Sequence, residues 1–270
     1  MKVLVLLPEC DYDPTESGVP WSAMMAAGHD IYFATPQGQP GHADDRLVDK
    51  GFSLLSPFLM TRKSDIQKYK TMAASERFLN PMTYGEVKAA QFDALFIPGG
   101  HAQGMKSMID SEVAQDICRH FFEAEKPVAA VCHGVLLLAR SKDKQGKAMI
   151  YGRHTTALPA SMELSAWAVT MPWLGSYYRT YPTTVESEVK QAVGESGSFD
   201  KGPLLPLRDS ESSQRFGFTV RDKNYLSARW PGDCNKFACD WVDLLAEYQP
   251  SSAAKLESES ESATETYATL

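Results

Sequence analysis

A cysteine at the junction of a buried strand and a helix is the residue best suited to covalent chemistry in this sequence. Residues 127–137 read Pro-Val-Ala-Ala-Val-Cys-His-Gly-Val-Leu-Leu, so an apolar run ends at Cys132 and Gly134 lets a helix begin at once. In such an elbow the nucleophile lies on a strained turn. The positive end of the helix is expected to lower the thiol pKa. The pattern predicts a nucleophile, and the alternative is a buried structural cysteine.

A second turn of related chemistry follows another apolar run. Residues 92–104 read Phe-Asp-Ala-Leu-Phe-Ile-Pro-Gly-Gly-His-Ala-Gln-Gly, with Gly99 and Gly100 directly after the run. Because glycine has no Cβ, this turn allows a backbone N–H to point into a cleft, as an oxyanion donor must. His101 could contact a substrate there, or it is an exposed turn histidine.

Glu16 is the acidic residue expected nearest to these turns. The stretch 13–21, Asp-Pro-Thr-Glu-Ser-Gly-Val-Pro-Trp, directly follows the first apolar run and leads into a helix. Glu16 is therefore expected at the carboxyl end of a strand, where a proton carrier could act. The helix dipole alone also favours an acid in a first helical turn, so both interpretations stay open.

The elements that position these residues predict a doubly wound α/β fold. Continuous apolar runs separated by helical stretches are typical of a mostly parallel sheet buried on both faces, with sites at the carboxyl ends of the strands. The predicted strands are 2–7, 30–35, 92–98 and 128–132, and the predicted helices are 19–27, 64–72, 112–125, 134–141 and 234–248.

Two insertions and a tail depart from this alternation. Residues 37–91 are longer than a simple crossover and are predicted to form a loop-and-helix insertion. The aromatic stretch 158–182 is either a satellite core or a cap over the site or dimer face. Residues 194–213 are predicted to form an exposed loop. We expect one domain over 1–248 and a disordered acidic tail over 249–270, which has too little apolar area to offset its ordering entropy.

The composition is that of an ordinary globular protein, with 43% hydrophobic and 23% charged residues and a net charge of −7. The sequence has no basic stripe, so no nucleic-acid partner is expected. No apolar run approaches the ~18–20 residues that cross a bilayer, so no membrane association is expected. The first apolar run is too short for a secretory leader, which favours the cytoplasm while leaving the nucleus open.

Neither a disulfide framework nor a metal site is predicted. The five cysteines show no CxxC spacing, which indicates reduced thiols rather than disulfides or a zinc knuckle. His29, His42, Asp44 and Asp45 do not form a spaced ligand set, and at most the last three could bind an ion weakly.

Together the motifs resemble the ThiJ/PfpI superfamily of class I glutamine amidotransferase-like proteins. The resemblance covers roughly residues 1–248 and rests on Glu16, Pro-Gly-Gly-His at 98–101 and Ala-Val-Cys-His-Gly at 130–134. It implies a flavodoxin-like α/β/α sandwich, homodimers, a small-molecule substrate and no cofactor. It also implies that Cys132 is the nucleophile and that Glu16 is hydrogen-bonded to its sulfur.

The resemblance also implies roles for further residues. The backbone N–H groups of Gly100 and His133 would form the oxyanion site. Where the elbow reads Cys-His, the family orients this histidine with a downstream acid, and Glu163 is the best match, although a helix-surface glutamate is the default interpretation. Arg229 lies in a stretch resembling the closing strand of the fold. It could bind a carboxylate or carbonyl, and a structural ion pair is the equal alternative.

The sequence departs from the family pattern at two points. No histidine lies beyond His154, so the His-x-Glu of true amidotransferases cannot be built. Leu158 stands where other members have a histidine, which makes His133 a better base than His154.

The resemblance implies three candidate functions. The first is a glyoxalase III-like enzyme in which the Cys132 thiolate attacks a 2-oxoaldehyde, Glu16 or His133 moves a proton between the carbons, and hydrolysis releases a 2-hydroxy acid. The second is a hydrolase or hydratase of amide, isocyanide or peptide substrates that uses the same thiolate. The third is not an enzyme but a redox sensor or holding chaperone, with Cys132 oxidised to a sulfinate.

Overall fold

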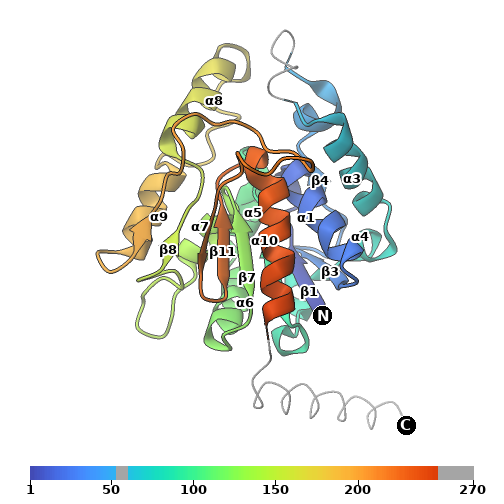
Figure 1. Cartoon of the computed structure of the whole chain (residues 1–270), viewed down its shortest axis with the longest axis vertical. Coiled ribbons are helices and arrows are strands. Elements are labelled where there is room, and N and C mark those ends of the chain that lie inside the picture. Colours follow the sequence, from blue (N-terminus) through green and yellow to red (C-terminus); the bar gives the residue numbers. More distant parts are fainter. Residues whose placement is uncertain (53–59, 249–270) are drawn as a thin grey trace.

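A seven-stranded, mostly parallel sheet forms the centre of this computed structural model, which describes residues 1–52 and 60–248 (Figure 1). The strands follow the order β10, β11, β7, β6, β1, β3 and β5, and within this sheet β10 and β11 pair antiparallel while the other pairs are parallel. Their bounds are β1 Lys2–Leu6, β3 Asp30–Thr35, β5 Met82–Thr83, β6 Ala94–Ile97, β7 Val128–Val131, β10 Thr219–Asp222 and β11 Tyr225–Ala228.

Helices cover both faces of this sheet. Those described are α1 Pro14–Ala26, α3 Lys63–Ala73, α4 Glu76–Leu79, α5 Lys106–Ile109, α6 Glu112–Glu123, α7 Gly134–Arg140, α8 Ala160–Leu174, α9 Val185–Val193 and α10 Cys234–Glu247. Helix α1 packs between α3 and α10 on one face, and α5, α6 and α7 pack together on the other. The predicted α/β/α sandwich is confirmed. None of the described helices is long and apolar enough to span a membrane.

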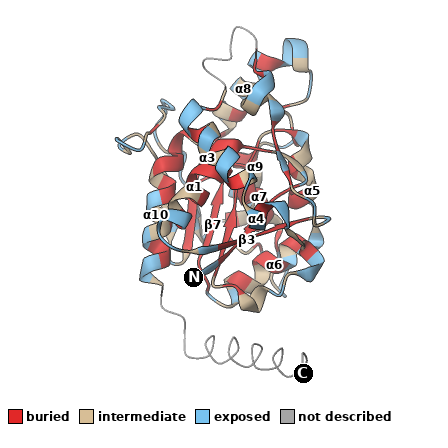
Figure 2. Ribbon diagram, turned by 90° about the vertical axis from the view of Figure 1, so that its right-hand side faces the viewer, coloured by how far each residue is buried: buried red, intermediate tan, exposed pale blue. Residues whose placement is uncertain are grey.

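The central strands are buried on both faces, as their continuous apolar runs predict. Every residue of β6, β7 and β11 is buried, and β1 is buried except for Lys2 (Figure 2). A parallel strand in this position needs apolar side chains on both sides of the sheet. The four predicted strands are confirmed, each ending within a residue or two of the expected position.

Capping residues set the starts of the helices that carry the site. Asp13 accepts hydrogen bonds from the backbone N–H groups of Thr15 at 2.7 Å and Glu16 at 3.1 Å, and Pro14 takes the first helical position of α1. Helix α1 therefore begins five residues before the predicted start, which places Glu16 in its first turn. Ser111 caps α6, since its side chain accepts a hydrogen bond from the backbone N–H of Ala114.

Two predicted irregular regions contain more structure than their composition indicated. The 37–91 insertion holds the predicted helix, seen as α3, and also supplies the edge strand β5. The loop predicted to be exposed over 194–213 contains β9 (Ser198–Phe199) and the buried Asp209. Asp209 accepts from the backbone N–H groups at the start of α10, so it is held inside as a cap. The prediction for 249–270 concerns residues outside those described.

Two pairs of short strands complete the described architecture beside the main sheet. Strand β2 (Cys10–Tyr12) pairs with β4 (His42–Ala43), and β8 (His154–Thr155) pairs with β9. Helix α9 packs against α7, and α8 packs against α9. Helix α8 lies at one end of the molecule (Figure 2).

The close approach of α7 to β6 generates a stability prediction. A Cβ on Gly134 would lie 2.7 Å from the carbonyl oxygens of both Ile97 and Pro98, so Gly134→Ala must push the helix away from the strand. We expect a loss of about 1–3 kcal/mol in the free energy of unfolding, measured by urea denaturation.

Gly85→Ala is the matched control. A Cβ there would meet only the Thr83 hydroxyl at 4.0 Å, and we expect a change within roughly 0.5 kcal/mol. Equal losses from the two substitutions would contradict the steric explanation.

Candidate active site

The elbow forms as the sequence predicts. Cys132 lies between β7 and α7 with φ 56°, in the left-handed region that a residue with a side chain rarely occupies. Its backbone N–H donates to the carbonyl oxygen of Ala228 at 3.1 Å, so the neighbouring strand β11 holds the strained residue in place. Such strain in a well-held turn is typical of functional sites.

The thiol of Cys132 is much less ionised than the sequence analysis expected. Its side chain is 3% exposed, and burial, followed by the neighbouring carboxyl group of Glu16, raises the pKa of the Cys132 thiol well above its ordinary value. The backbone N–H of His133 opposes this effect but does not outweigh it. The expected lowering of the pKa is therefore wrong, because the helix terminus contributes less than desolvation costs. At neutral pH the resting thiol is protonated, and a base must remove its proton.

Glu16 lies beside this thiol with its carboxyl group completely buried. A Cβ on Gly99 would lie 2.6 Å from Glu16 Oε2 and 2.7 Å from Cys132 Cβ, which places the carboxyl group against both residues. Among the described residues, neither carboxyl oxygen has a hydrogen bond of normal geometry. Burial, followed by the charge of Asp13, raises the pKa of Glu16 well above its ordinary value. The carboxyl group of Glu16 therefore favours its protonated form, in which it carries a proton beside the sulfur.

The paired glycines lie where a side chain cannot fit. A Cβ on Gly99 would also lie 2.5 Å from the carbonyl oxygen of Val131, so only glycine lets the β6 turn approach the elbow. The backbone amide of Gly99 faces Glu16 and favours its ionised form. Gly100 lines the pocket described below. Of the two glycines predicted to contact a substrate, Gly100 is therefore the better placed.

His133 provides the base nearest the thiol. Its Nδ1 lies 3.6 Å from Cys132 Sγ, and its ring is completely buried. Burial lowers the pKa of His133 well below its ordinary value, so the resting ring is neutral and one of its two nitrogens has a free lone pair. Its Nε2 atom has no hydrogen-bond partner among the described residues.

His101 packs against His133 rather than standing exposed in its turn. The two rings have centroids 5.0 Å apart, and His101 also contacts Tyr178 at 5.5 Å. Burial lowers the pKa of His101 to about 4, so this imidazole is also neutral. Its Nε2 is buried without a partner among the described residues, and His101 lines the pocket.

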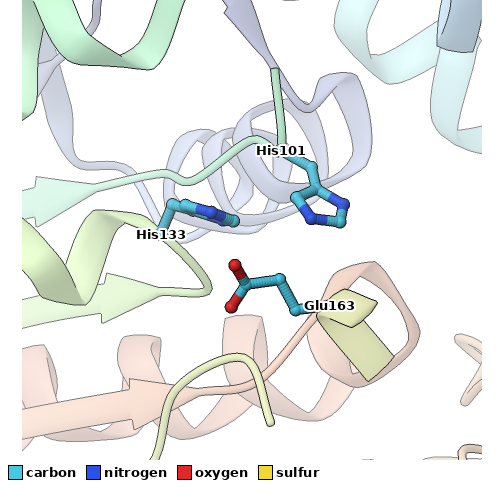
Figure 3. Close-up of side chains that lie close together, drawn as sticks. All are labelled: His101, His133 and Glu163. Atoms are coloured by element: carbon cyan, nitrogen blue, oxygen red, sulfur yellow. The ribbon is translucent and has the colours of Figure 1, made fainter. Parts of the chain in front are cut away.

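Glu163 comes from α8 to face the two imidazoles (Figure 3). A nitrogen of each histidine and an oxygen of Glu163 lie within 4.8 Å of one another. The carboxylate accepts from Arg179 Nη1 at 2.6 Å and from the backbone N–H of Val185 at 2.8 Å. Burial raises the pKa of Glu163, while these two donors oppose the shift. The predicted acid thus lies near His133, although no hydrogen bond joins them.

A pocket of about 470 Å³ opens onto the thiol. Its floor holds Glu16, Gly100, His101 and Cys132. Its walls are mainly apolar, with the side chains of Leu47, Phe52, Leu158, Met162, Val169, Leu204, Pro206 and Trp230. The 158–182 insertion forms a wall of the site, which favours its interpretation as a cap, because six of the lining residues lie on α8: Ser161, Met162, Ser165, Ala166, Val169 and Thr170.

Arg229 lies outside this pocket. Its guanidinium group is 1% exposed and makes two hydrogen bonds to the Asp233 carboxylate, at 2.9 Å from Nε and 2.8 Å from Nη2. Nη1 is within hydrogen-bond distance of the carbonyl oxygens of Lys201 and Pro203. The geometry favours the structural ion pair over substrate binding.

Sequence reasoning missed three residues at the site. Arg179 binds Glu163, Arg208 lines the pocket with its guanidinium 5.3 Å from the ring centroid of Trp230, and Tyr178 packs on His101. The aromatic richness of 158–182 pointed to the segment that holds Tyr178. No local pattern marks either arginine.

The fold and the elbow define a class of α/β sandwich proteins in which a cysteine lies between a parallel strand and its helix. The chain belongs to the ThiJ/PfpI-like family, because the family model described as ThiJ/PfpI family-like matches residues 7–203.

Individual relatives agree with this assignment. A deglycase from Thermococcus kodakarensis is 36% identical over 61% of this chain and 69% of its own length. A glutathione-independent glyoxalase from Schizosaccharomyces pombe is 25% identical over 52% of this chain and 56% of the relative. The chain spans half the length, 50%, of an uncharacterised S. pombe protein at 25% identity. The crystal structure of glyoxalase III from Candida albicans has the same fold, with a TM-score of 0.66 at 19% identity over 93% of this chain and 98% of that one.

The buried, protonated thiol generates a prediction for chemical modification. At pH 7.5 we expect iodoacetamide to alkylate the exposed Cys239 at least tenfold faster than Cys132, because the thiolate is the reactive form. Between pH 7 and 9 the Cys132 rate should rise roughly tenfold per pH unit, because a raised pKa leaves the thiol in its protonated regime. Peptide mass spectrometry measures both rates. A Cys132 rate that levels off near pH 7 would show an activated thiolate instead.

Proposed function

We propose that this chain is a cofactor-independent enzyme that converts 2-oxoaldehydes into 2-hydroxy acids through Cys132, in the manner of a glyoxalase III. The observation that carries the proposal is a thiol at the pocket floor with two distinct proton carriers beside it, the neutral acid Glu16 and the neutral base His133. This reaction needs both a nucleophile and a group that moves a proton between adjacent carbons. The names of the glyoxalase relatives support the same chemistry.

The first step is attack on the aldehyde carbon. His133 Nδ1 accepts the thiol proton as Cys132 Sγ bonds to the carbon, giving a hemithioacetal. The negative charge that develops on the former aldehyde oxygen is stabilised by the backbone N–H groups of Gly100 and His133, and the oxygen is then protonated. Because the thiol loses its proton only as the bond forms, Cys132 itself stays uncharged in the resting site.

The later steps move one proton and add one water. His133, neutral again once it has given the thiol proton to the former aldehyde oxygen, removes the hydrogen from the former aldehyde carbon, and the resulting enediol is protonated at the neighbouring ketone carbon. The product of this transfer is a thioester of Cys132. Water then attacks the thioester, the carbon–sulfur bond breaks, and the 2-hydroxy acid leaves with the thiol restored. No electrons are exchanged with any other molecule, so this series of reaction steps requires no cofactor.

The nucleophile is tested by measuring lactate formed from methylglyoxal. We expect Cys132→Ser to lower kcat/KM by roughly a thousandfold or more, because a hydroxyl cannot replace the thiol in this step. Cys239→Ser is the matched control and should keep the wild-type rate, because Cys239 is exposed and does not line the pocket. Equal activities of wild type and Cys132→Ser would end the proposal.

The pocket volume generates a prediction about substrate size. A space of about 470 Å³ with apolar walls is much larger than methylglyoxal requires. We expect phenylglyoxal to be converted with a kcat/KM at least tenfold higher, because burying each additional CH₂-sized group contributes about 0.8 kcal/mol.

Two substitutions on α8 test this size preference. Val169→Trp should fill the pocket and lower kcat/KM for phenylglyoxal several-fold more than for methylglyoxal. Met171→Trp is the control, because Met171 is similarly exposed on the same helix but does not line the pocket. Equal effects of Val169→Trp on both substrates would show that this wall does not select for size.

A further inference from the structure

We propose that His101, His133 and Glu163 form a binding site for a divalent transition-metal ion of the zinc type, and that the bound ion switches off the thiol site. The three residues come from separate parts of the chain: the turn after β6, the elbow and helix α8 (Figure 3). Their possible ligand atoms lie within 4.8 Å of one another. Two imidazoles and one carboxylate are a donor set that zinc commonly uses.

The unpartnered nitrogen atoms are the independent sign of a ligand. Nε2 of His101 and Nε2 of His133 are both buried, and neither has a hydrogen-bond partner among the described residues. A buried polar atom without a partner is costly and calls for an explanation. An imidazole binds a metal ion through the lone pair of an unprotonated ring nitrogen, and a neutral ring has one such nitrogen.

The geometry requires only a small closure. Donor atoms about 2.1 Å from a tetrahedral ion lie roughly 3.4 Å apart, so the three side chains need to approach by at most ~1.4 Å. His101 lines the pocket, which gives the ion access and leaves room for water at the open position.

Arg179 opposes a cation here, since its guanidinium lies 2.6 Å from Glu163 Oε1, and the positive charge of Arg140 also acts on His133. Its side chain is 19% exposed, whereas that of Glu163 is 1% exposed, so the arginine can turn toward solvent while the carboxylate stays. The backbone N–H of Val185 continues to hold the other oxygen. A carboxylate has enough lone pairs to bind this donor and an ion together.

The tautomer of His133 links the ion to the thiol. A metal ion on Nε2 takes the lone pair there and forces the ring proton onto Nδ1. Nδ1 is the atom 3.6 Å from Cys132 Sγ, and once protonated it can no longer accept the thiol proton. The ion would thus remove the base that the proposed reaction uses without touching the sulfur.

The binding test uses the full-length protein freed of metal with EDTA. Adding Zn²⁺ at a hundredfold excess over its Kd should raise Tm by roughly 4–8 °C. Co²⁺ should give visible d–d absorption without the strong thiolate-to-cobalt band of a sulfur ligand. Neither readout depends on catalysis, so failure of the reaction proposed above leaves this test intact.

Variants decide which residues hold the ion. His101→Phe keeps the ring contacts with His133 and Tyr178 but should weaken Zn²⁺ binding at least tenfold, and Glu163→Gln, a second variant, should do the same. Cys132→Ser should bind as wild type does. His154→Ala, at an exposed histidine outside the pocket, is the matched control and should also bind normally. Circular dichroism confirms that each variant is folded.

Three results would overturn the proposal. They are no saturable binding by wild type, unchanged binding in His101→Phe and Glu163→Gln, or loss of binding in Cys132→Ser, which would place the ion on the thiol. For an active wild type, Zn²⁺ should inhibit at concentrations matching the Kd measured by Tm. Inhibition that persists at the same concentration in a folded His101→Phe variant would likewise refute the switch.

Discussion

The closeness of two strand-end turns is the constraint on which the site depends. The turn after β6 approaches the elbow after β7 so tightly that a Cβ on Gly99 would lie 2.5 Å from the Val131 carbonyl oxygen. On the helix that follows the elbow, a Cβ on Gly134 would likewise lie 2.7 Å from the carbonyl oxygens of Ile97 and Pro98. Because both positions lack a side chain, the parallel strands can end at one edge, and the thiol and the pocket-lining Gly100 can lie within a single cleft.

That tight packing determines the electrostatics of the site. Excluding water from Glu16 and Cys132 raises the pKa of both groups, and the same exclusion lowers the pKa of His133 and His101. Each shift has burial as its first cause and favours the uncharged form. Any reaction at this sulfur would therefore have to create charge in a site that excludes water. A buried, protonated thiol is protected from unwanted modification. A negatively charged oxygen formed beside it would need hydrogen-bond donors that are already in position.

The sequence predicted best those parts of the site that a short run of residues determines by itself. The strand-Cys-His-Gly run predicted the elbow, and the Pro-Gly-Gly-His run predicted the facing turn, because glycine is required at those positions for backbone reasons. The thiol pKa could not be predicted in the same way. A helix N-terminus is visible in the sequence, whereas desolvation depends on what packs around Cys132 from α1 and the β6 turn. For the same reason the sequence left open whether Arg229 binds a ligand, because Asp233 becomes its partner only through the turn after β11.

The remaining half of the site depends on long-range packing. Glu163 reaches the imidazoles only because α8 folds back over the sheet edge, and it is held there by Arg179, sixteen positions further along the chain, and by the first residue of α9. Thus the nucleophile and its neighbouring acid belong to the rigid sheet layer, whereas the acid facing His133 belongs to the cap. Any movement of α8 changes the size of the apolar pocket and the distance from Glu163 to the base together. The cap therefore couples the shape of any molecule held in the pocket to the position of the acid facing His133, while the thiol itself stays fixed in the sheet layer.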